Sequence, residues 1–189
     1  MEKGLGDEVI IFITIVPLIP FLMILAVDVY YEGETAKAVA LLFNWKDDAP
    51  VQTFTTYIDR VAPYEPGHFY KRELPCIQAV LEEVDFEQVD AILIDGYVYA
   101  SNTKAYGLGG HLYEDIARRA PIIGVAKTPF ANNEDTCMEV TRGDSKKPLY
   151  VSAIGIDLAE AAVEVAGMHG EFRIPTVLKE LDRLTRAEG

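Results

Sequence analysis

The sequence predicts an α/β fold built on a mixed sheet, in which three antiparallel strands precede parallel strands and helices cover both faces. Three apolar segments near the beginning follow one another with only short turns between them, which is typical of antiparallel neighbours. After them, helical patterns alternate with short and uniformly apolar segments, which is typical of strands that are buried on both faces. The 189 residues are enough for one domain with its own core.

The first half of the chain supplies the antiparallel strands and one helix. Strands are expected at residues 23–32, 36–45 and 51–58, with turns at GET and KDDAP between them. The loop VAPYEPG follows, and its Pro and Gly residues end the third strand. A helix is expected over residues 68–84, because apolar residues recur on one face of it. That face contains Ile77, Val80, Leu81 and Val84.

The second half alternates strands and helices. The predicted strands are 90–95, 121–127, a short one near 138–141, and 149–155. The predicted helices lie near 111–119, 157–168 and 176–187, and the first of them follows a long loop that runs through Gly110. This order predicts further strands that join the first three in one sheet, with helices packed against it.

The N-terminal segment has an unusual composition. Residues 9–27 contain no charged side chain, so hydropathy alone indicates a membrane span. Pro17 and Pro20 would disrupt a helix there, and the segment continues into a strand that the soluble fold requires. We therefore expect residues 1–22 to form an extension or a peripheral strand outside the core, and residues 23–189 to form a single domain. A membrane-tethered form is the weaker alternative.

Charge and cysteine content limit the possible functions. The formal net charge of -13 argues against a broad electrostatic grip on nucleic acid, although it allows a local basic cleft or a site in which metal ions supply positive charge. Cys76 and Cys137 lack the spacing of a zinc site, and the three histidines show no HxxxH or HExxH pattern. We expect reduced thiols in a cytoplasmic protein.

Three acids occupy positions where a carboxylate is costly. Asp28 interrupts the apolar run ILAVDVYY, Asp95 ends the run AILID, and Glu73 lies between them in a helical segment. If the two strands are neighbours, the three carboxylates can meet and hold Mg²⁺, which prefers such oxygen ligands. The alternative is that Asp28 marks an exposed strand end, Asp95 caps a turn and Glu73 is a solvated helix residue.

Two further residues fit the chemistry of a phosphodiester. Lys127 ends the segment PIIGVAK, where its ammonium group can reach a phosphate or a leaving oxygen. Tyr64 lies between prolines in PYEP, and a ring held on a stiff loop can stack on a base or wedge into a duplex. A solvated strand end and an ordinary turn aromatic are the alternatives.

Several segments together resemble the endonuclease V family of deaminated-base repair nucleases, which has a ribonuclease H-like fold. The resemblance covers roughly residues 23–186, and its segments occur in the family's order and near its spacing. They are AVDVYY, PYEPGHFYKRE, LIDGYVYA, GLGGHL, IGVAK, KPLYVS and RIPTVLKELDRLTR. PYEPGHFYKRE and IGVAK are the most specific of them.

The resemblance implies roles by position. It implies that Asp28, Glu73 and Asp95 are the catalytic metal-binding carboxylates, and that Lys127 supports the phosphate. Asp182, in the last helix, matches a position where the family carries an Asp or His near the metal, so it is the expected fourth acid. The remaining matches are to nucleic-acid-binding positions of the family. They are Tyr64, as the strand-separating wedge, with Pro66 and Gly67 of its turn, and Gly96 beside the third acid.

The chain also departs from the family. Where the family carries DGHGxAHP after the strand acid, this chain has DGYVYASN, so Tyr97 and Ser101 replace two histidines. Two classes of function therefore stay open. The first is a Mg²⁺-dependent monomeric endonuclease, with Mn²⁺ as a substitute, that cleaves DNA or RNA beside a deaminated purine such as inosine. The second is a catalytically altered relative that binds nucleic acid or a protein.

Overall fold

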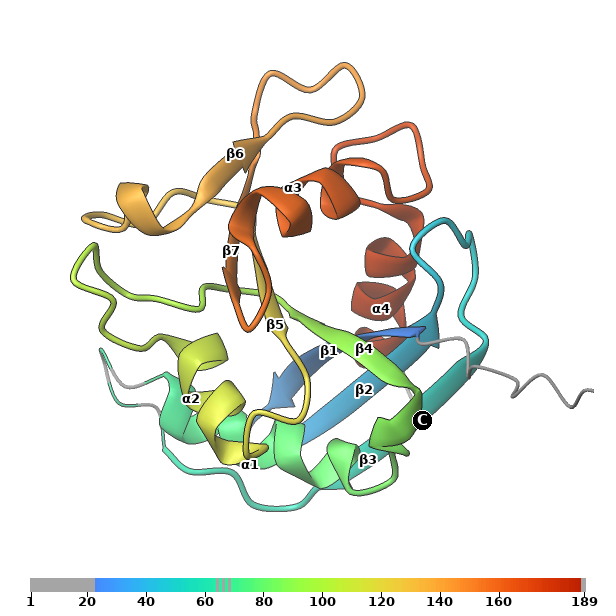
Figure 1. The fold of residues 1–189 in the computed structure, drawn as a ribbon. Coiled ribbons are helices and arrows are strands. Elements are labelled where there is room, and N and C mark those ends of the chain that lie inside the picture. The colour runs from blue at the N-terminus through green and yellow to red at the C-terminus, as the bar shows by residue number, and fades with distance from the viewer. Residues whose placement is uncertain (1–22, 64, 66, 68, 188–189) are drawn as a thin grey trace, which may run out of the picture.

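The computed structural model of the chain describes residues 23–63, 65, 67 and 69–187. These residues form a mixed sheet with the strand order β3-β2-β1-β4-β5-β7-β6 (Figure 1). The strands are β1 Met23–Glu32, β2 Thr35–Phe43, β3 Gln52–Ile58, β4 Val89–Ile94, β5 Ile122–Ala126, β6 Met138–Val140 and β7 Leu149–Ile154. The helices are α1 Tyr70–Leu81, α2 Leu108–Asp115, α3 Leu158–Ala166 and α4 Thr176–Arg186, with short 3₁₀ turns at Phe86–Gln88 and Glu134–Thr136.

The predicted fold class is confirmed. Strands β1, β2 and β3 pair antiparallel, β4 runs parallel to β1, and β5 runs parallel to β4. The last two strands differ from the expectation, because β7 is antiparallel to β5 and β6 is antiparallel to β7. No α-helix lies between β5 and β7 to carry the chain back across the sheet, so the chain returns in the opposite direction.

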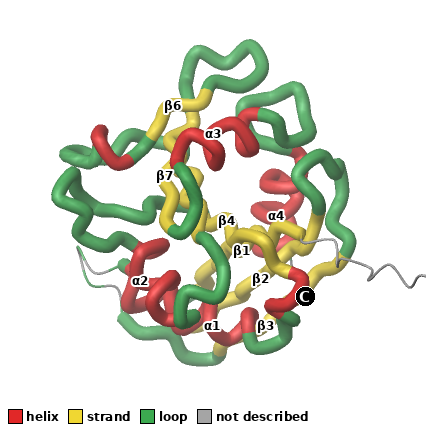
Figure 2. Tube along the Cα trace, in the orientation of Figure 1, coloured by secondary structure: helices red, strands yellow, loops and turns green. Residues whose placement is uncertain are grey.

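Helices cover both faces of the sheet, as the sequence predicts, and each face has its own core (Figure 2). Helices α1 and α2 pack on one face, where Ile77 and Leu112 are fully buried. Helices α3 and α4 pack on the other, where Val165 and Val177 are buried. Successive residues of β1 point to opposite cores, which explains why this strand is apolar at almost every position up to Asp28.

Helix α2 begins earlier and ends earlier than the predicted 111–119. It starts at Leu108 and therefore includes Gly109 and Gly110, which the sequence analysis assigned to a loop. A side chain at Gly110 would lie 2.5 Å from the ring of Tyr106, so glycine is required by close packing and not by a turn. The helix ends at Asp115, because the backbone turns left-handed at Ala117, with φ 55°.

Some predictions fall outside the described residues. The N-terminal extension 1–22 is one of them, and so are Tyr64 and Pro66 of the expected wedge loop. In the part of the chain that is described, no helix is both long enough and apolar enough to cross a membrane.

Candidate active site

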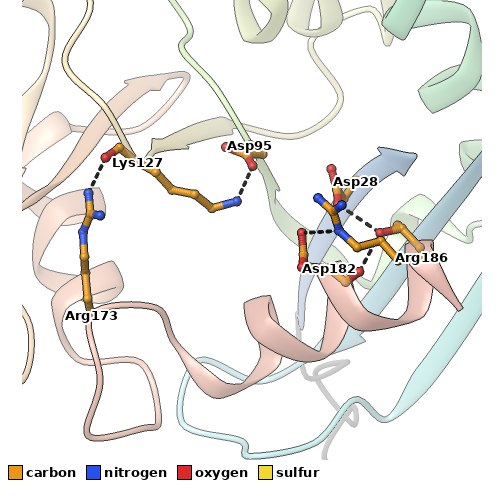
Figure 3. Close-up of polar contacts among 7 residues, drawn as sticks. Asp28, Asp95, Lys127, Arg173, Asp182 and Arg186 are labelled. Carbon is orange, nitrogen blue, oxygen red and sulfur yellow. Dashed lines mark hydrogen bonds and ion pairs between the residues drawn. The ribbon is translucent and has the colours of Figure 1, made fainter. Parts of the chain in front are cut away.

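Asp28 and Asp95 lie side by side at one edge of the sheet. The parallel register of β1 and β4 pairs Val27 with Ile94, so the next residue of each chain segment is one of the two acids. The condition that the sequence analysis set, adjacency of the two strands, is therefore met. Asp28 is partly buried, and Asp95 is exposed just beyond the end of β4. Both line a small cavity of about 40 Å³ together with Lys127 and Asp182 (Figure 3).

Lys127 approaches these acids from the next strand. It follows β5, whose parallel register with β4 places it beside Asp95, and its Nζ lies 2.6 Å from Oδ2 of Asp95. Burial opposes the charged form of Lys127, but the hydrogen bond to Asp95 and the charges of Asp95, Asp28 and Asp182 outweigh burial and raise its pKa. The lysine is therefore a cation held inside a group of acids.

Glu73 is the most buried of the acids. It lies in the first turn of α1 with only 5% of its surface exposed, so it is not a solvated helix residue. Burial, and then the charges of Asp28 and Asp95, raise its pKa to about 8. Its Oε2 atom is buried and has no hydrogen-bond partner among the described residues. An unpaired buried carboxylate oxygen is costly, and a cation is the kind of partner that satisfies it.

Asp182 and Thr185 complete the site from α4. The hydroxyl of Thr185 shares its one proton between two acceptors, Oδ2 of Asp28 at 3.3 Å and the carbonyl oxygen of Asp182 at 3.0 Å. Asp182 accepts a hydrogen bond from Nε of Arg186 at 3.1 Å (Figure 3). The neighbouring Arg183 pairs with Glu180 instead. Asp182 therefore faces the cavity, as the resemblance implies, and its own helix supplies its cationic partner.

The pKa of Asp28 shows how strongly the site opposes negative charge. Burial and then the charge of Asp95 raise this pKa, although Val29, Lys127 and Thr185 act in the opposite direction. Repulsion between the carboxylates of Asp28 and Asp95 therefore destabilises the site, and a divalent cation would remove that repulsion.

The residues present fit a hard divalent cation in their chemistry. Carboxylate oxygens are the ligands that Mg²⁺ and Mn²⁺ prefer, and the orphaned oxygen of Glu73 supplies a free ligand. Within the described ranges, no three His, Cys, Asp or Glu side chains already surround one point closely enough to hold a metal ion. Lys127 and Arg186 currently engage two of the acids, Asp95 and Asp182, so binding requires these side chains to move.

The altered residues of the loop after Asp95 form hydrogen bonds within the loop and to the segment after β5. The hydroxyl of Tyr97 donates to the carbonyl of Thr128 at 2.7 Å, and the Tyr97 ring lies 5.9 Å from that of Phe130. Ser101 accepts a hydrogen bond from the amide of Ala105 at 3.2 Å. The two residues that replace histidines therefore shape the loop and bring no imidazole to the site.

Two glycines named in the sequence analysis have left-handed backbones. Gly67 has φ 80° and Gly96 has φ 138°, conformations that side chains disfavour. The carbonyl of Gly96 would lie 2.5 Å from a side chain at Gly124, so β5 can approach this turn only with glycine there. The turn after Asp95 is thus held close to the sheet.

Sequence reasoning missed Thr185 and Ser152. Thr185 is 1% exposed and continues the buried stripe Val177, Leu181 at a spacing of four residues, so a polar residue in that stripe was the available signal. Ser152 is fully buried in β7, and its Oγ accepts from the amide of Val98 at 2.9 Å. That bond fixes the start of the altered loop, and nothing local in the sequence indicates it.

A family model described as Endonuclease V matches residues 16–165, which is well over half of the chain. The chain belongs to the endonuclease V family. Among curated relatives, the endonuclease V of Ignicoccus hospitalis is 26% identical over 174 residues, covering 85% of this chain and 79% of its own length. The endonuclease V of Streptomyces coelicolor is 29% identical, with 85% and 76% covered.

Solved structures agree with this assignment. The endonuclease V of Streptomyces avermitilis has 26% identity and a TM-score of 0.68, covering 88% of this chain and 81% of its own. The endonuclease V of Ciona intestinalis, solved with a 24mer DNA containing an inosine followed by a ribo-adenosine, has a TM-score of 0.71 with 87% and 84% covered. At 21% identity the latter likeness shows the fold alone.

The predicted family and enzyme class are thus confirmed. An endonuclease V is a nuclease, which hydrolyses phosphodiester bonds, and the family implies a divalent metal cofactor. The family match ends at residue 165, before α4 begins. The assignment of Asp182 therefore depends on its position at the cavity and on the resemblance of the last helix.

Proposed function

We propose that this chain is a Mg²⁺-dependent endonuclease that cleaves DNA or RNA one nucleotide beyond a deaminated purine, with inosine as the typical lesion. The observation that carries the proposal is the adjacency of Asp28 and Asp95 at neighbouring strands. The buried Glu73 is close enough to both for their charges to raise its pKa. The DNA in the Ciona intestinalis complex contains an inosine, and the shared family supports the same substrate class here.

Four carboxylates would hold the metal. The proposed ligands are Asp28, Glu73, Asp95 and Asp182. Asp28, Asp95 and Asp182 line one cavity, and the charges of Asp28 and Asp95 act on Glu73. When bound, a divalent cation polarises the scissile phosphate and lowers the pKa of an attacking water. Mg²⁺ suits carboxylate ligands that leave room for waters and a substrate phosphate, and Mn²⁺ is the expected substitute.

Lys127 would hold the phosphate. Its ammonium group is a compact charge at the edge of the cavity, and it can turn from Asp95 to a phosphate oxygen without leaving its strand end. There it stabilises the negative charge that develops on the phosphate or on the leaving 3′-oxygen, and the products are a 3′-hydroxyl and a 5′-phosphate. The hydrogen bond from Thr185 would keep Asp28 in one orientation while Lys127 turns from Asp95 to the phosphate.

Recognition of the damaged base is assigned to the loops beside the acids. We assign the role of strand-separating wedge to Tyr64, with Pro66 and Gly67 in the same turn, and a nucleic-acid contact to Gly96. Extruding a base costs a few kcal/mol, and less at a mismatch, so the extrusion step itself favours deaminated bases. The left-handed Gly67 and Gly96 would let the backbone approach the substrate closely.

The altered loop favours a second candidate, a relative that binds nucleic acid without cleaving it. Tyr97 and Ser101 occupy the family's two histidine positions. The Tyr97 hydroxyl bonds to the carbonyl of Thr128 after β5, and Ser101 accepts a hydrogen bond within its own loop. The nuclease is nevertheless the better supported function, because a buried glutamate with one unbonded oxygen costs stability, and a metal ligand is a role that would justify this cost.

The test is a nicking assay with the full-length chain. Labelled single- and double-stranded oligonucleotides, in DNA and RNA, are incubated with Mg²⁺, each with and without one inosine. Inosine-dependent nicking that is lost in Asp28→Asn supports the enzyme. Binding without nicking of any substrate supports the second candidate. We further propose a monomer in the cytoplasm, which agrees with the two free cysteines, Cys76 and Cys137.

A further inference from the structure

A groove lined by charged side chains and one aromatic ring adjoins the candidate active site on the side of α4. It has a volume of about 650 Å³ and lies between the β6–β7 connection, the loop before α4, and α4 itself. Ile174 lines both this groove and the cavity that Asp28 and Asp95 line, so the two adjoin at this residue. The other residues that line the groove are Gly143, Asp144, Ser145, Glu171, Phe172, Arg173 and Lys179.

The side chains that line the groove are balanced in charge, and two exposed lysines beside it add positive charge. Arg173 and Lys179 line it, and Lys146 and Lys147 follow Ser145 directly and are exposed, against the two acids Asp144 and Glu171. Neither Lys146, Lys147 nor Lys179 forms an ion pair with any described residue, whereas the lysine of the active site is paired. In a chain of net charge -13, exposed lysines that have no ion-pair partner beside the site are groups that an anionic ligand could contact.

An exposed aromatic ring lies among these cations. Phe172 is 57% exposed, and the ammonium group of Lys179 lies 3.9 Å from the centre of its ring. An exposed ring beside the active site of a nuclease offers a planar surface on which a base of matching size can stack. Cations interleaved with an aromatic ring are typical of surfaces that bind single-stranded nucleic acid, in which phosphates pair with lysines and bases stack.

The groove is also held rigidly to the active site. The guanidinium of Arg173 donates to the carbonyls of Lys127 and Pro148, the latter at 2.6 Å (Figure 3). Below it, the buried Arg142 donates to the carbonyl of Phe172 at 3.0 Å and to that of Gly170 at 3.1 Å. Phe172 therefore lies at a fixed position relative to Lys127, as a subsite for a continuous strand requires.

We infer that this groove binds the single-stranded segment of the substrate that flanks the scissile phosphate, with Phe172 stacking on a base and Lys146, Lys147 and Lys179 contacting phosphates. The inference rests on the proposed function, because only that function places a scissile phosphate in the neighbouring cavity. The strand in the groove is the one that carries this phosphate. We expect the groove to hold one flank only, because it meets the cavity at a single residue, Ile174.

Fluorescence anisotropy with the full-length chain tests the groove. The probes are two single-stranded DNA oligonucleotides with one inosine, one with a long 5′ flank and a short 3′ flank, and the other reversed, in Ca²⁺ to allow binding. Phe172→Ala should weaken binding by roughly 10-fold for one of the two probes. Lys179→Gln should lower the slope of log affinity against log salt by about 1 for the same probe.

Arg119→Gln is the matched control. Its guanidinium carbon lies 3.9 Å from the centre of the Phe86 ring, the same geometry as in the Lys179 pair, but near the end of the sheet where β4 begins. This variant should leave both the affinity and the salt slope unchanged, which shows that a loss in Lys179→Gln is not a general effect of charge.

The possible outcomes test the groove inference and the nuclease proposal independently. Unchanged affinity in Phe172→Ala and Lys179→Gln, or an equal loss for both probes, overturns the inference even if the wild type nicks inosine substrates. A loss confined to one probe supports the groove even if no substrate is nicked, in which case the nuclease proposal alone has failed. Absence of binding of either probe to the wild type overturns the groove.

Discussion

The ammonium nitrogen of Lys127 lies 2.6 Å from Oδ2 of Asp95, and this ion pair closes the gap between the ends of β5 and β4. The two side chains are 48% and 43% exposed, so water screens the pair and its contribution to stability is at most about 1 kcal/mol. The importance of the pair lies in where it positions the ammonium group of Lys127. It holds a cation beside the acids, at the position where a phosphate would enter the cavity.

Lys127→Met should abolish most cleavage without destabilising the protein. Loss of the charge that stabilises the phosphate should lower the cleavage rate by about 10²–10³-fold, and the melting temperature should change little. Single-turnover cleavage and thermal melts measure the two effects. Arg118→Gln removes an exposed ion pair with Glu114 at 2.9 Å, away from the site, and should change neither. Equal cleavage by Lys127→Met and wild type would exclude the phosphate role.

The stability of the metal-free protein should fall as the pH rises from about 4.5 to about 8. In this range the folded Glu73, whose pKa is raised to about 8, keeps a proton that the unfolded chain has released. Raising the pH therefore favours unfolding, with a slope of at most about 1.4 kcal/mol per pH unit from one such group. Urea denaturation in EDTA across this range measures it.

Glu73→Gln should flatten that pH dependence and stabilise the metal-free protein at the upper end of the range, because the amide cannot ionise. Glu82→Gln, an exposed acid at the end of the same helix, is the control and should retain the wild-type slope. If Glu73→Gln kept the full slope, the raised pKa of Glu73 would be excluded as its source.

Thr185→Val should lower activity more than stability. Valine matches threonine in shape but cannot donate to Asp28 or to the carbonyl of Asp182, so Asp28 loses its orientation toward the cavity. We expect a destabilisation of about 1 kcal/mol and a loss of cleavage of roughly 10-fold or more. Thr185→Ser keeps the hydroxyl and should restore the rate even if its stability is lower.

Arg173 should act on catalysis through Lys127. Its guanidinium bonds the Lys127 and Pro148 carbonyls, so Arg173→Ala frees the strand end that carries the lysine. We expect slower cleavage at saturating substrate, by roughly 10-fold, and partial rescue by added guanidinium ion. In a protein labelled with ¹³C-carbonyl lysine, the Lys127 signal should shift in the variant and return with guanidinium. A Lys127 signal identical in wild type and variant would show that Arg173 does not hold this carbonyl.

The sequence predicts the strands of this fold better than its helix boundaries. Apolar runs such as 90–95 are long enough to identify a buried strand, and the register that places Asp28 beside Asp95 follows once the strands are known to be neighbours. The start of α2 was missed because Gly109 and Gly110 are typical of loops, whereas here they allow close packing against Val98 and Tyr106. That packing is a tertiary contact, which no local pattern encodes.

The residues of the candidate site also fall into two groups, those that the sequence indicates and those whose roles follow only from the fold. The three main acids were recognised because each disrupts an apolar pattern or matches a family motif, and Lys127 because it ends a buried strand. Thr185 and Arg173 act through hydrogen bonds to residues far away in the chain, so their roles follow only from the fold. The burial of Glu73 could not be predicted from the sequence, because it depends on how α1 packs on the sheet.

Calorimetric titration of the full-length chain with Mn²⁺ tests the central claim, that Asp28, Glu73 and Asp95 form a divalent metal site. We predict saturable binding by the wild type, and its loss in Asp28→Asn and Glu73→Gln, with Glu82→Gln binding as the wild type does. Saturable binding of equal affinity in wild type, Asp28→Asn and Glu73→Gln, or no binding by a wild-type protein that is shown to be folded, would contradict the account.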